Sequence, residues 1–362
     1  MTDRAIAPEL RSAEVVGVDL GGTKVAVARL SAGELSQPAI APTELGRQER
    51  LIDQLVSMVQ DCRGPRLDAV GIGVPSVVEF ETGRVVASAN IPLADVPLRR
   101  VLGERLGVPV FVDNDATVAA LAEAHDERLA MTARDLVMFT IGTGVGGGLV
   151  LGGRIYRGAT GAAGELGHTL VCADLRAPWP TGDPFPKPGS LERAASGHAL
   201  DALARELARE RPDGGLGRIV AAGGEVAGAD AVACARAGDP HAAQIVSLWA
   251  GRLGIGIANA INTFDPDEVV IGGGGAQAGE LLLEPARRVA QGYVLPGAGR
   301  RTTIRLARHG VQAGVLGAAL LAAHELAGPG AGAAGSSAAE GSGAPGPSCA
   351  AGPSGAPAGA AG

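Results

Sequence analysis

Two glycine-rich stretches that carry a threonine lie about 120 residues apart in this sequence. The first reads DLGGTK at 19–24, and the second reads TIGTGVGGG at 140–148. Each lies between two apolar runs, a pattern that predicts a β-hairpin with a glycine turn. Backbone N–H groups at such turns bind phosphate oxygens, so the repetition predicts two similar α/β halves that hold the phosphates of one nucleotide between them.

The second stretch also contains the spacing G-x-G-x-x-G of dinucleotide-binding loops, at Gly142, Gly144 and Gly147. A dinucleotide loop needs a helix after its glycines, whereas LVLGGRIY follows here and alternates like a strand. Glu165 has nearly the spacing of the acid that binds ribose, but GATGAAGELGH around it is not the end of a parallel strand. We therefore favour phosphate-binding hairpins. The plainer alternative is that the glycines only make tight turns.

Polar side chains beside the turns are candidates for phosphate and metal contacts. Asp19 closes the first apolar run and is a candidate ligand for Mg²⁺, directly or through water, with a turn-forming aspartate as the alternative. Thr23, Lys24 and Thr143 stand where they can meet phosphate oxygens. A third glycine run, Gly272–Gly275, follows a predicted strand and precedes a predicted helix, where glycine permits the close approach of an adenosine.

Asp115, in VDNDA at 112–116, is the candidate general base for phosphoryl transfer. It follows a predicted strand, so its carboxylate can project towards bound substrates. From the residues alone, a helix N-cap before an alanine-rich helix is the favoured role for this aspartate. Asp113, two residues earlier, is the other candidate base.

The 362 residues suggest two domains, and 46% of them are hydrophobic but only 2% aromatic. The net charge of −7 argues against nucleic acid or an anionic membrane as a partner. The scattered cysteines predict a reducing cytoplasm. Residues 1–13 lack an apolar signal core, and we expect no apolar run to approach the roughly 18 residues of a membrane span.

Apolar periodicity and glycine turns predict an alternation of strands and helices. Strands are expected at 14–20, 24–30, 69–74, 84–87, 108–112, 135–141, 148–156, 267–275 and 302–306. Helices are expected at about 48–62, 94–106, from Asp115 or Ala116 onwards, and at 191–210, 229–237, 240–263, 278–292 and 313–327.

These motifs together resemble the ROK family of sugar kinases and sugar-responsive repressors, within the actin-like ATPase superfamily. The resemblance covers roughly 14–327 and rests on DLGGTK, VDNDA, TIGTGVGGG, GAAGELGH (161–168) and GSLE (189–192). It implies an α/β fold of two actin-like (ribonuclease H-like) domains with an interdomain cleft. Repressors of the family carry a winged helix-turn-helix before the first hairpin, and thirteen residues are too few for one, so we expect a kinase.

The resemblance also implies a domain division. An extension at 1–13 precedes an N-terminal domain of 14–116, to which the last helix, 313–327, returns. A C-terminal domain covers 117–312. Residues 328–362 are almost entirely Gly, Ala, Ser and Pro, which predicts a disordered tail.

For the site, the resemblance implies Asp115 as general base and ATP with Mg²⁺ as cofactors. The expected sugar-binding residues are Asn90, Asn114, Asp115, Glu165, His168 and Glu192. The expected ATP-binding residues are Gly21, Gly22, Thr23, Lys24, Thr143, Gly144, Gly273 and Gly274. The expected activity is a cytoplasmic, homodimeric glucokinase. N-acetylmannosamine, N-acetylglucosamine, mannose or fructose as the sugar, and a sugar-binding regulator without catalysis, are the alternatives.

The sequence departs from the family at its zinc motif and near Asn90. Most relatives bind zinc with a histidine and three cysteines, but the loop after His168 has only Cys172, and Ser190 stands at the last cysteine position. We therefore predict no zinc site. We expect the prolines of this loop to stiffen it by fixing φ, and Trp179 and Phe185 are candidate apolar anchors. The prolines are Pro178, Pro180, Pro184, Pro186 and Pro188. Leu93 replaces the aromatic residue common after the Asn-x-Pro of relatives.

Overall fold

The first glycine turn joins the central strands of a six-stranded sheet, the first sheet. The computed structural model describes residues 7–88, 90–172 and 185–328. The strand order is β3–β2–β1–β5–β9, and β4 also pairs with β2. β1 is antiparallel to β2 and parallel to β5, which is parallel to β9. The bounds are β1 Val15–Leu20, β2 Lys24–Ser31, β3 Glu34–Leu35, β4 Ala39–Pro42, β5 Ala69–Val74 and β9 Val110–Asn114.

The second glycine turn occupies the same place in a second sheet. Its order is β12–β11–β10–β13–β15, with an antiparallel hairpin followed by two parallel pairings. The bounds are β10 Leu136–Ile141, β11 Val145–Leu151, β12 Arg154–Ile155, β13 Glu268–Gly272 and β15 Thr303–Leu306. The same strand order in both sheets confirms the α/β class and the duplication predicted from the repeated hairpin.

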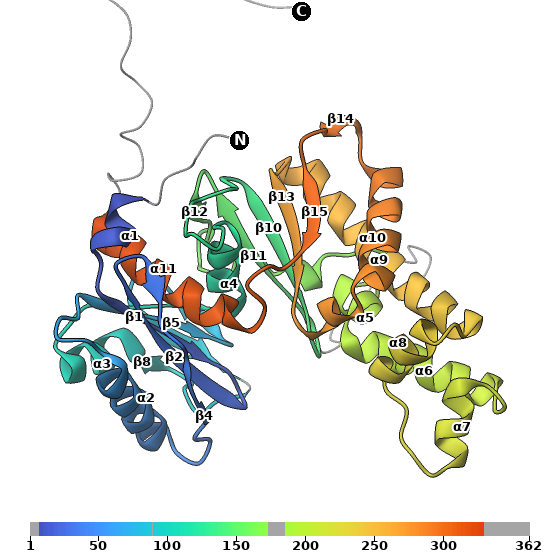
Figure 1. The fold of residues 1–362 in the computed structure, drawn as a ribbon, viewed down its shortest axis with the longest axis horizontal. Coiled ribbons are helices and arrows are strands. Elements are labelled where there is room, and N and C mark those ends of the chain that lie inside the picture. The colour runs from blue at the N-terminus through green and yellow to red at the C-terminus, as the bar shows by residue number, and fades with distance from the viewer. Residues whose placement is uncertain (1–6, 89, 173–184, 329–362) are drawn as a thin grey trace, which may run out of the picture. The chain divides into compact units, whose positions relative to one another are not determined.

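Helices pack on both sheets, and a small third sheet consists of β6 Val77–Glu79, β7 Arg84–Ala87 and β8 Val96–Pro97. The helices are α1 Pro8–Ser12, α2 Gln48–Cys62, α3 Leu98–Leu106, α4 Asp115–Glu123, α5 Leu191–Ala195, α6 Gly197–Glu210, α7 Gly215–Ala221, α8 Gly228–Arg236, α9 Pro240–Phe264, α10 Glu280–Tyr293 and α11 Ala313–Ala327. A short strand, β14, covers Pro296–Gly299. Figure 1 shows α9 and α10 side by side in the part of the chain that follows the second hairpin.

Several predicted elements need correction. The helix expected at 94–106 begins only at Leu98, because Asp95 has a φ of 61° and Val96–Pro97 pairs with β7 instead. The strand expected at 108–112 runs from Val110 to Asn114, where it stays paired with β5.

The strand expected at 148–156 and the helix expected at 191–210 are each two elements. Gly152 and Gly153 have φ of 63° and 83° and make a tight turn between β11 and β12. Ser196 is extended, and its side chain accepts the Ala199 N–H, so it ends α5 and caps α6. The sequence patterns predicted neither α1 and α7 nor the short strands β3, β4, β6, β8 and β14.

Alternation along β1 and β5 assigns their side chains to two faces of the first sheet. Val16, Val18 and Ile72 pack in the same core as residues of α2 and α3. The opposite face carries Gly17 and Gly71, and α11 packs on it against both strands (Figure 1). Asp19 is two residues after Gly17, so its side chain lies on this same face.

Helix α4 packs against backbone from both sheets and from α11. A β-carbon on Gly148 of β11 would lie 2.6 Å from the Ala116 carbonyl oxygen. One on Gly317 of α11 would lie 1.8 Å from the Val118 carbonyl oxygen. These separations leave no room for a side chain, so glycine at both positions lets α4 approach the neighbouring backbones closely.

The expectation that no apolar run reaches the length of a membrane span is wrong for one segment. Gly310–Ala327 has 18 residues and a mean hydropathy of 1.3, which is long and apolar enough by length and composition alone. Its helix, α11, packs on β1, β5 and α4, and Leu316, Leu320 and Leu321 are buried there. The apolar composition is therefore that of a core helix.

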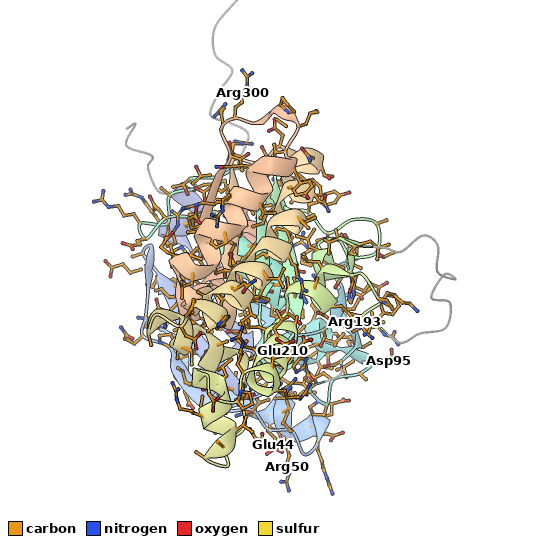
Figure 2. All side chains as sticks on the ribbon, turned by 90° about the vertical axis from the view of Figure 1, so that its right-hand side faces the viewer. Glu44, Arg50, Asp95, Arg193, Glu210 and Arg300 are labelled. Atoms are coloured by element: carbon orange, nitrogen blue, oxygen red, sulfur yellow. The ribbon has the colours of Figure 1, made fainter. Side chains whose placement is uncertain are left out.

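Charged side chains lie mostly at the periphery, as Figure 2 shows for Arg50 and Arg300, which point away from the ribbon. Asp113 and Glu123 are exceptions, with exposed fractions of 3% and 0%. Buried carboxylates are costly unless they are paired or used, so these positions need an explanation from their neighbours.

We predict that Gly317→Ala destabilises the protein by roughly 2–3 kcal/mol or more, because the new β-carbon overlaps the Val118 carbonyl of α4. In the interior of a helix, alanine is normally about 1 kcal/mol more favourable than glycine, so helix propensity alone would give the opposite result. Gly103→Ala in α3 is the matched control, since the nearest atom, the Val108 carbonyl oxygen, would lie 3.5 Å away. Urea denaturation measures both variants, and equal stabilities would contradict the close packing of α4.

Candidate active site

Asp115 is the first residue of α4 and comes directly after β9. The helix cap is its neighbour Asn114, whose Oδ1 accepts hydrogen bonds from the N–H groups of Ala116 and Thr117 at 2.9 and 3.2 Å. The N-cap role considered for Asp115 therefore belongs to Asn114. The Asp115 carboxylate lies in the first turn of the helix, where it accepts the Ala116 N–H at 2.7 Å.

The electrostatic surroundings of Asp115 suit a proton acceptor near neutral pH. The pKa of Asp115 is raised to about 6, and burial is the largest cause. The nearby carboxylates of Asp19 and Glu165 act in the same direction, while the N–H groups of Ala116 and of Asp115 itself oppose the shift. A base with a pKa close to the working pH combines a useful ionised fraction with strong proton affinity. Asp19 of DLGGTK, Asp115 of VDNDA and Glu165 of GAAGELGH are therefore close enough to influence one another electrostatically.

Asp19 faces α11 and pairs through its backbone with Ala26 of β2 and Gly73 of β5. A β-carbon on Gly314 would lie 2.5 Å from its Cγ, so the carboxylate lies against the first turn of α11. Burial raises the pKa of Asp19, and the charge of Lys24 lowers it. A partly buried carboxylate whose ionised form is stabilised by a nearby positive charge fits Mg²⁺, which takes few protein carboxylates and completes its shell with phosphates and water.

The first glycine turn leaves its polar residues accessible. Thr23 and Lys24 are exposed, and the turn is closed by the Gly21 N–H, which donates to the Lys24 carbonyl at 3.0 Å. A β-carbon on Gly22 would lie 3.2 Å from Cβ of Asn90. A predicted ATP-binding turn and a predicted sugar-binding residue are therefore in contact.

Glu192 lies against the second glycine turn. Its Oε2 accepts the Val145 N–H at 2.8 Å, and a β-carbon on Gly144 would lie 2.3 Å from that same oxygen. Gly142 and Thr143 at the tip of the turn are exposed. The structure thus groups Glu192 with a predicted phosphate-binding turn, while its other oxygen, Oε1, lies farther from Gly144.

The third glycine run lies beside the second turn. A β-carbon on Gly273, whose φ is 79°, would lie 2.5 Å from the carbonyl oxygen of Ile141, the last residue of β10. At Gly274 a β-carbon would meet nothing within 4 Å. Open space beside an exposed turn is what the close approach of an adenosine requires.

Glu165 precedes and His168 ends one short 3₁₀ turn, Leu166–His168, with His168 Nε2 3.7 Å from Glu165 Oε2. The His168 ring meets Phe185 edge-on, with the ring centroids 5.3 Å apart. Phe185, a candidate apolar anchor of this loop, is thus in contact with His168. Trp179 and the prolines at 178, 180 and 184 lie outside the described residues.

Ser190, at the position of the family's last cysteine, is 1% exposed and caps α5 by accepting the Arg193 N–H. In the part of the chain that the structure describes, no three His, Cys, Asp or Glu side chains are grouped so as to hold a metal ion. The expectation of a chain without zinc stays a prediction.

Arg157, which no sequence motif singled out, reaches the site from the loop after β12. Its Nε donates to Asp113 Oδ2 at 2.7 Å, and the Asn114 N–H donates to the other oxygen, Oδ1, at 2.9 Å. Burial raises the pKa of Asp113, and the guanidinium opposes this. Both carboxylate oxygens of Asp113 are therefore hydrogen-bonded, whereas the hydrogen bond to the Asp115 carboxylate described above engages one of its oxygens.

A cavity of about 730 Å³ lies elsewhere, on α6 and α7, with Arg205, Pro212 and Val226 among its lining residues. None of its lining residues belongs to the predicted site. We assign the site by the convergence of carboxylates and glycine turns, because these groups carry the chemistry.

Comparison with known proteins agrees with this geometry. A family model described as ROK family matches residues 15–325. A glucokinase of Halalkalibacterium halodurans is 36% identical over 310 residues, which cover 83% of this chain and 92% of that protein.

Two solved structures are also similar. A ROK hexokinase from Thermus thermophilus has 37% identity and a TM-score of 0.69, covering 87% of this chain and 99% of that one. A ROK family glucokinase from Streptomyces griseus, in complex with glucose and AMPPNP, has 31% identity and a TM-score of 0.68, covering 86% and 99%. These matches confirm the expected fold of actin-like α/β halves.

We predict that the pKa of Asp115 is about 6 and falls when a neighbouring negative charge is removed. Glu165→Gln and Asp19→Asn should each lower it, because either carboxylate disfavours the ionised form of Asp115. Carbon-13 NMR titration of labelled aspartate carboxyls measures the shift, with the Asp115→Asn variant identifying the signal. Glu104→Gln, at an exposed position of α3, is the control. An Asp115 pKa near 4 that is the same in the wild type and in both variants would contradict the proposed grouping of these carboxylates.

Proposed function

Because this chain belongs to the ROK family, we propose that it is an ATP-dependent hexose kinase that converts glucose and ATP to glucose 6-phosphate and ADP. The observation that carries the proposal is Asp115, a partly buried carboxylate at the start of α4 whose pKa is raised to about 6. The glucokinases among the similar proteins support glucose as the sugar.

Asp115 would act as the general base. Its carboxylate takes the proton of the sugar 6-hydroxyl as that oxygen forms a bond to the γ-phosphorus, while the bond from the γ-phosphorus to the bridging oxygen of ADP breaks. Asp113 is less suited to this step, because Arg157 and the Asn114 N–H engage its two oxygens. The proximity of Glu165 supports binding of the sugar beside the base.

The glycine turns would hold the nucleotide. Gly21, Gly22, Thr23 and Lys24 on one side, and Thr143 and Gly144 on the other, offer N–H, hydroxyl and ammonium donors to the phosphates. Gly273 and Gly274 would lie along the adenosine. Asp19 is the residue that would hold Mg²⁺, which when bound neutralises charge on the phosphates.

The sugar would be held by Asn90, Asn114, Glu165, His168 and Glu192, as well as by Asp115. Three of these have a side-chain oxygen already bound to backbone N–H groups, namely Asn114, Asp115 and Glu192. Each of these side chains would therefore bind the sugar with its remaining polar atoms, while the bonded oxygen holds the neighbouring backbone in place. Phe185 supports the orientation of His168 in place of the family's zinc.

We also propose the division into an N-terminal domain of 14–116 with 313–327 and a C-terminal domain of 117–312, a homodimer, and a cytoplasmic location. The packing of α11 on the first sheet supports the first of these. The family resemblance supports the other two.

The proposed activity is tested by ADP release in a coupled assay with glucose, mannose, fructose, N-acetylglucosamine and N-acetylmannosamine. We expect the highest kcat/KM with glucose. A higher kcat/KM with an N-acetylated sugar would assign the alternative kinase specificity, for which Leu93 near Asn90 is the first residue to exchange. Sugar binding without ADP release from any sugar would make the protein a regulator and contradict the proposal.

We predict that Asp115→Asn lowers kcat by roughly 10²–10⁴, the usual worth of a general base. The variant should fold, and at pH 8 its free energy of unfolding should equal or exceed that of the wild type. The reason is that the raised pKa makes the ionised form of Asp115 unfavourable in the folded state above about pH 6. Steady-state kinetics and urea denaturation measure both effects. An active Asp115→Asn variant would remove Asp115 from this role.

A further inference from the structure

Arg157 links the second sheet to the strand end that carries Asp115. The Tyr156 N–H donates to the Leu149 carbonyl of β11 at 2.9 Å, so the chain leaves the second sheet at this point. The next residue, Arg157, extends its side chain to the first sheet, where Nε binds Asp113 Oδ2 of β9 at 2.7 Å. One side chain therefore ties the two halves together beside the site.

The guanidinium of Arg157 is held from three directions. Besides Asp113, its Nη2 binds Glu325 Oε1 of α11 at 3.0 Å, and its Cζ lies 3.4 Å from the centroid of the Phe80 ring. The Arg157 side chain is only 20% exposed. Paired charges and an aromatic face in such a partly buried position hold the side chain in one geometry.

Asp113 depends on this partner. Its side chain is 5% exposed, and burial raises its pKa. Removal of one partner of a buried ion pair leaves a charge that must shift, take up a proton or draw in water. Asn114 and Asp115 follow directly in the chain, and Asn114 donates its N–H to Asp113, so any shift is passed to the base.

The backbone of Arg157 begins the loop that carries Glu165 and His168. Its carbonyl accepts the Ala163 N–H at 3.0 Å and closes the first turn of this loop. Within that turn, Gly161 lies so close to the first half that a β-carbon would be 2.4 Å from the Val78 carbonyl oxygen. The start of the loop is therefore held against β6, and near its end Glu165 is close enough to Asp115 to raise the pKa of that carboxyl.

We propose that Arg157 is a positioning residue for phosphoryl transfer. Its ion pair with Asp113 fixes the start of the 157–168 loop against the end of β9, and this holds Glu165 and His168 at fixed positions relative to Asp115. The kinetic part of this inference rests on the proposed hexose kinase activity. A displacement of about 1 Å between substrate and base can lower the rate about 10²-fold, so a residue that never touches the sugar can control turnover.

The test compares Arg157→Gln with Glu325→Gln, which removes the other carboxylate partner of the same guanidinium and leaves Asp113 paired. We expect Arg157→Gln to lower kcat/KM for glucose by roughly 30–100-fold, with the KM for ATP changed less than about threefold. Glu325→Gln should stay within about threefold of the wild type. Arg157→Lys should recover part of the loss, since it restores the charge without the planar fork.

Because Arg157→Gln leaves a buried charge and can unfold the protein, Arg157→Gln with Asp113→Asn is the second variant. It removes that charge, and we expect recovered stability with kcat/KM still low, because the shorter glutamine cannot span to β9. Recovery of both stability and kcat/KM would show a purely structural role and overturn the inference, as would an Arg157→Gln enzyme within about threefold of the wild type.

Hydrogen exchange separates this inference from the proposed activity. Arg157→Gln should speed amide exchange in 112–118 and 157–168 but not in α9, whereas Glu325→Gln should leave all three unchanged. This result would support the link even if the wild type phosphorylated no sugar, an outcome that would overturn the kinase proposal alone. Unchanged exchange in 112–118 and 157–168 would overturn the link itself.

Discussion

The site depends on how closely α4 can approach the backbones around it. Gly148 of β11 and Gly317 of α11 have no side chains where the helix crosses them, and the carbonyl oxygens of Ala116 and Val118 fill that space. The helix therefore has little freedom to slide or rotate. Since Asp115 is its first residue and follows β9 without a loop, both sheets together set the position of this carboxylate.

The site also contains carboxylates that are wholly or partly buried, and the neighbours of each one determine whether it serves structure or proton transfer. Asp113 is compensated by Arg157 and engaged at both oxygens, so it holds structure together. Asp115 is near the carboxylates of Asp19 and Glu165, which raise its pKa in addition to burial. The carboxylates of this cluster repel one another and stay close together only because the surrounding fold holds them there. Sugar hydroxyl groups and a bound cation would reduce this repulsion.

The duplicated hairpin was predictable, because a strand, a glycine turn and a second strand leave a local pattern. The same holds for α2, predicted at 48–62 and found at Gln48–Cys62. Pairings between distant segments leave no such pattern: Arg157 and Asp113 are 44 positions apart, and the sequence around Arg157 gives no sign of its partner. The cap at Asn114 was missed for a different reason, since Asn and Asp are nearly equal as caps and stand side by side here.

The central claim is that the sugar 6-hydroxyl meets the carboxylate at the start of α4. A crystal structure with glucose and a non-hydrolysable ATP analogue measures this directly. The account predicts the 6-oxygen within about 3 Å of an Asp115 carboxylate oxygen, on the side facing the γ-phosphate. A sugar bound with its 6-oxygen against another residue, or with Asp115 turned away from it, would contradict the account.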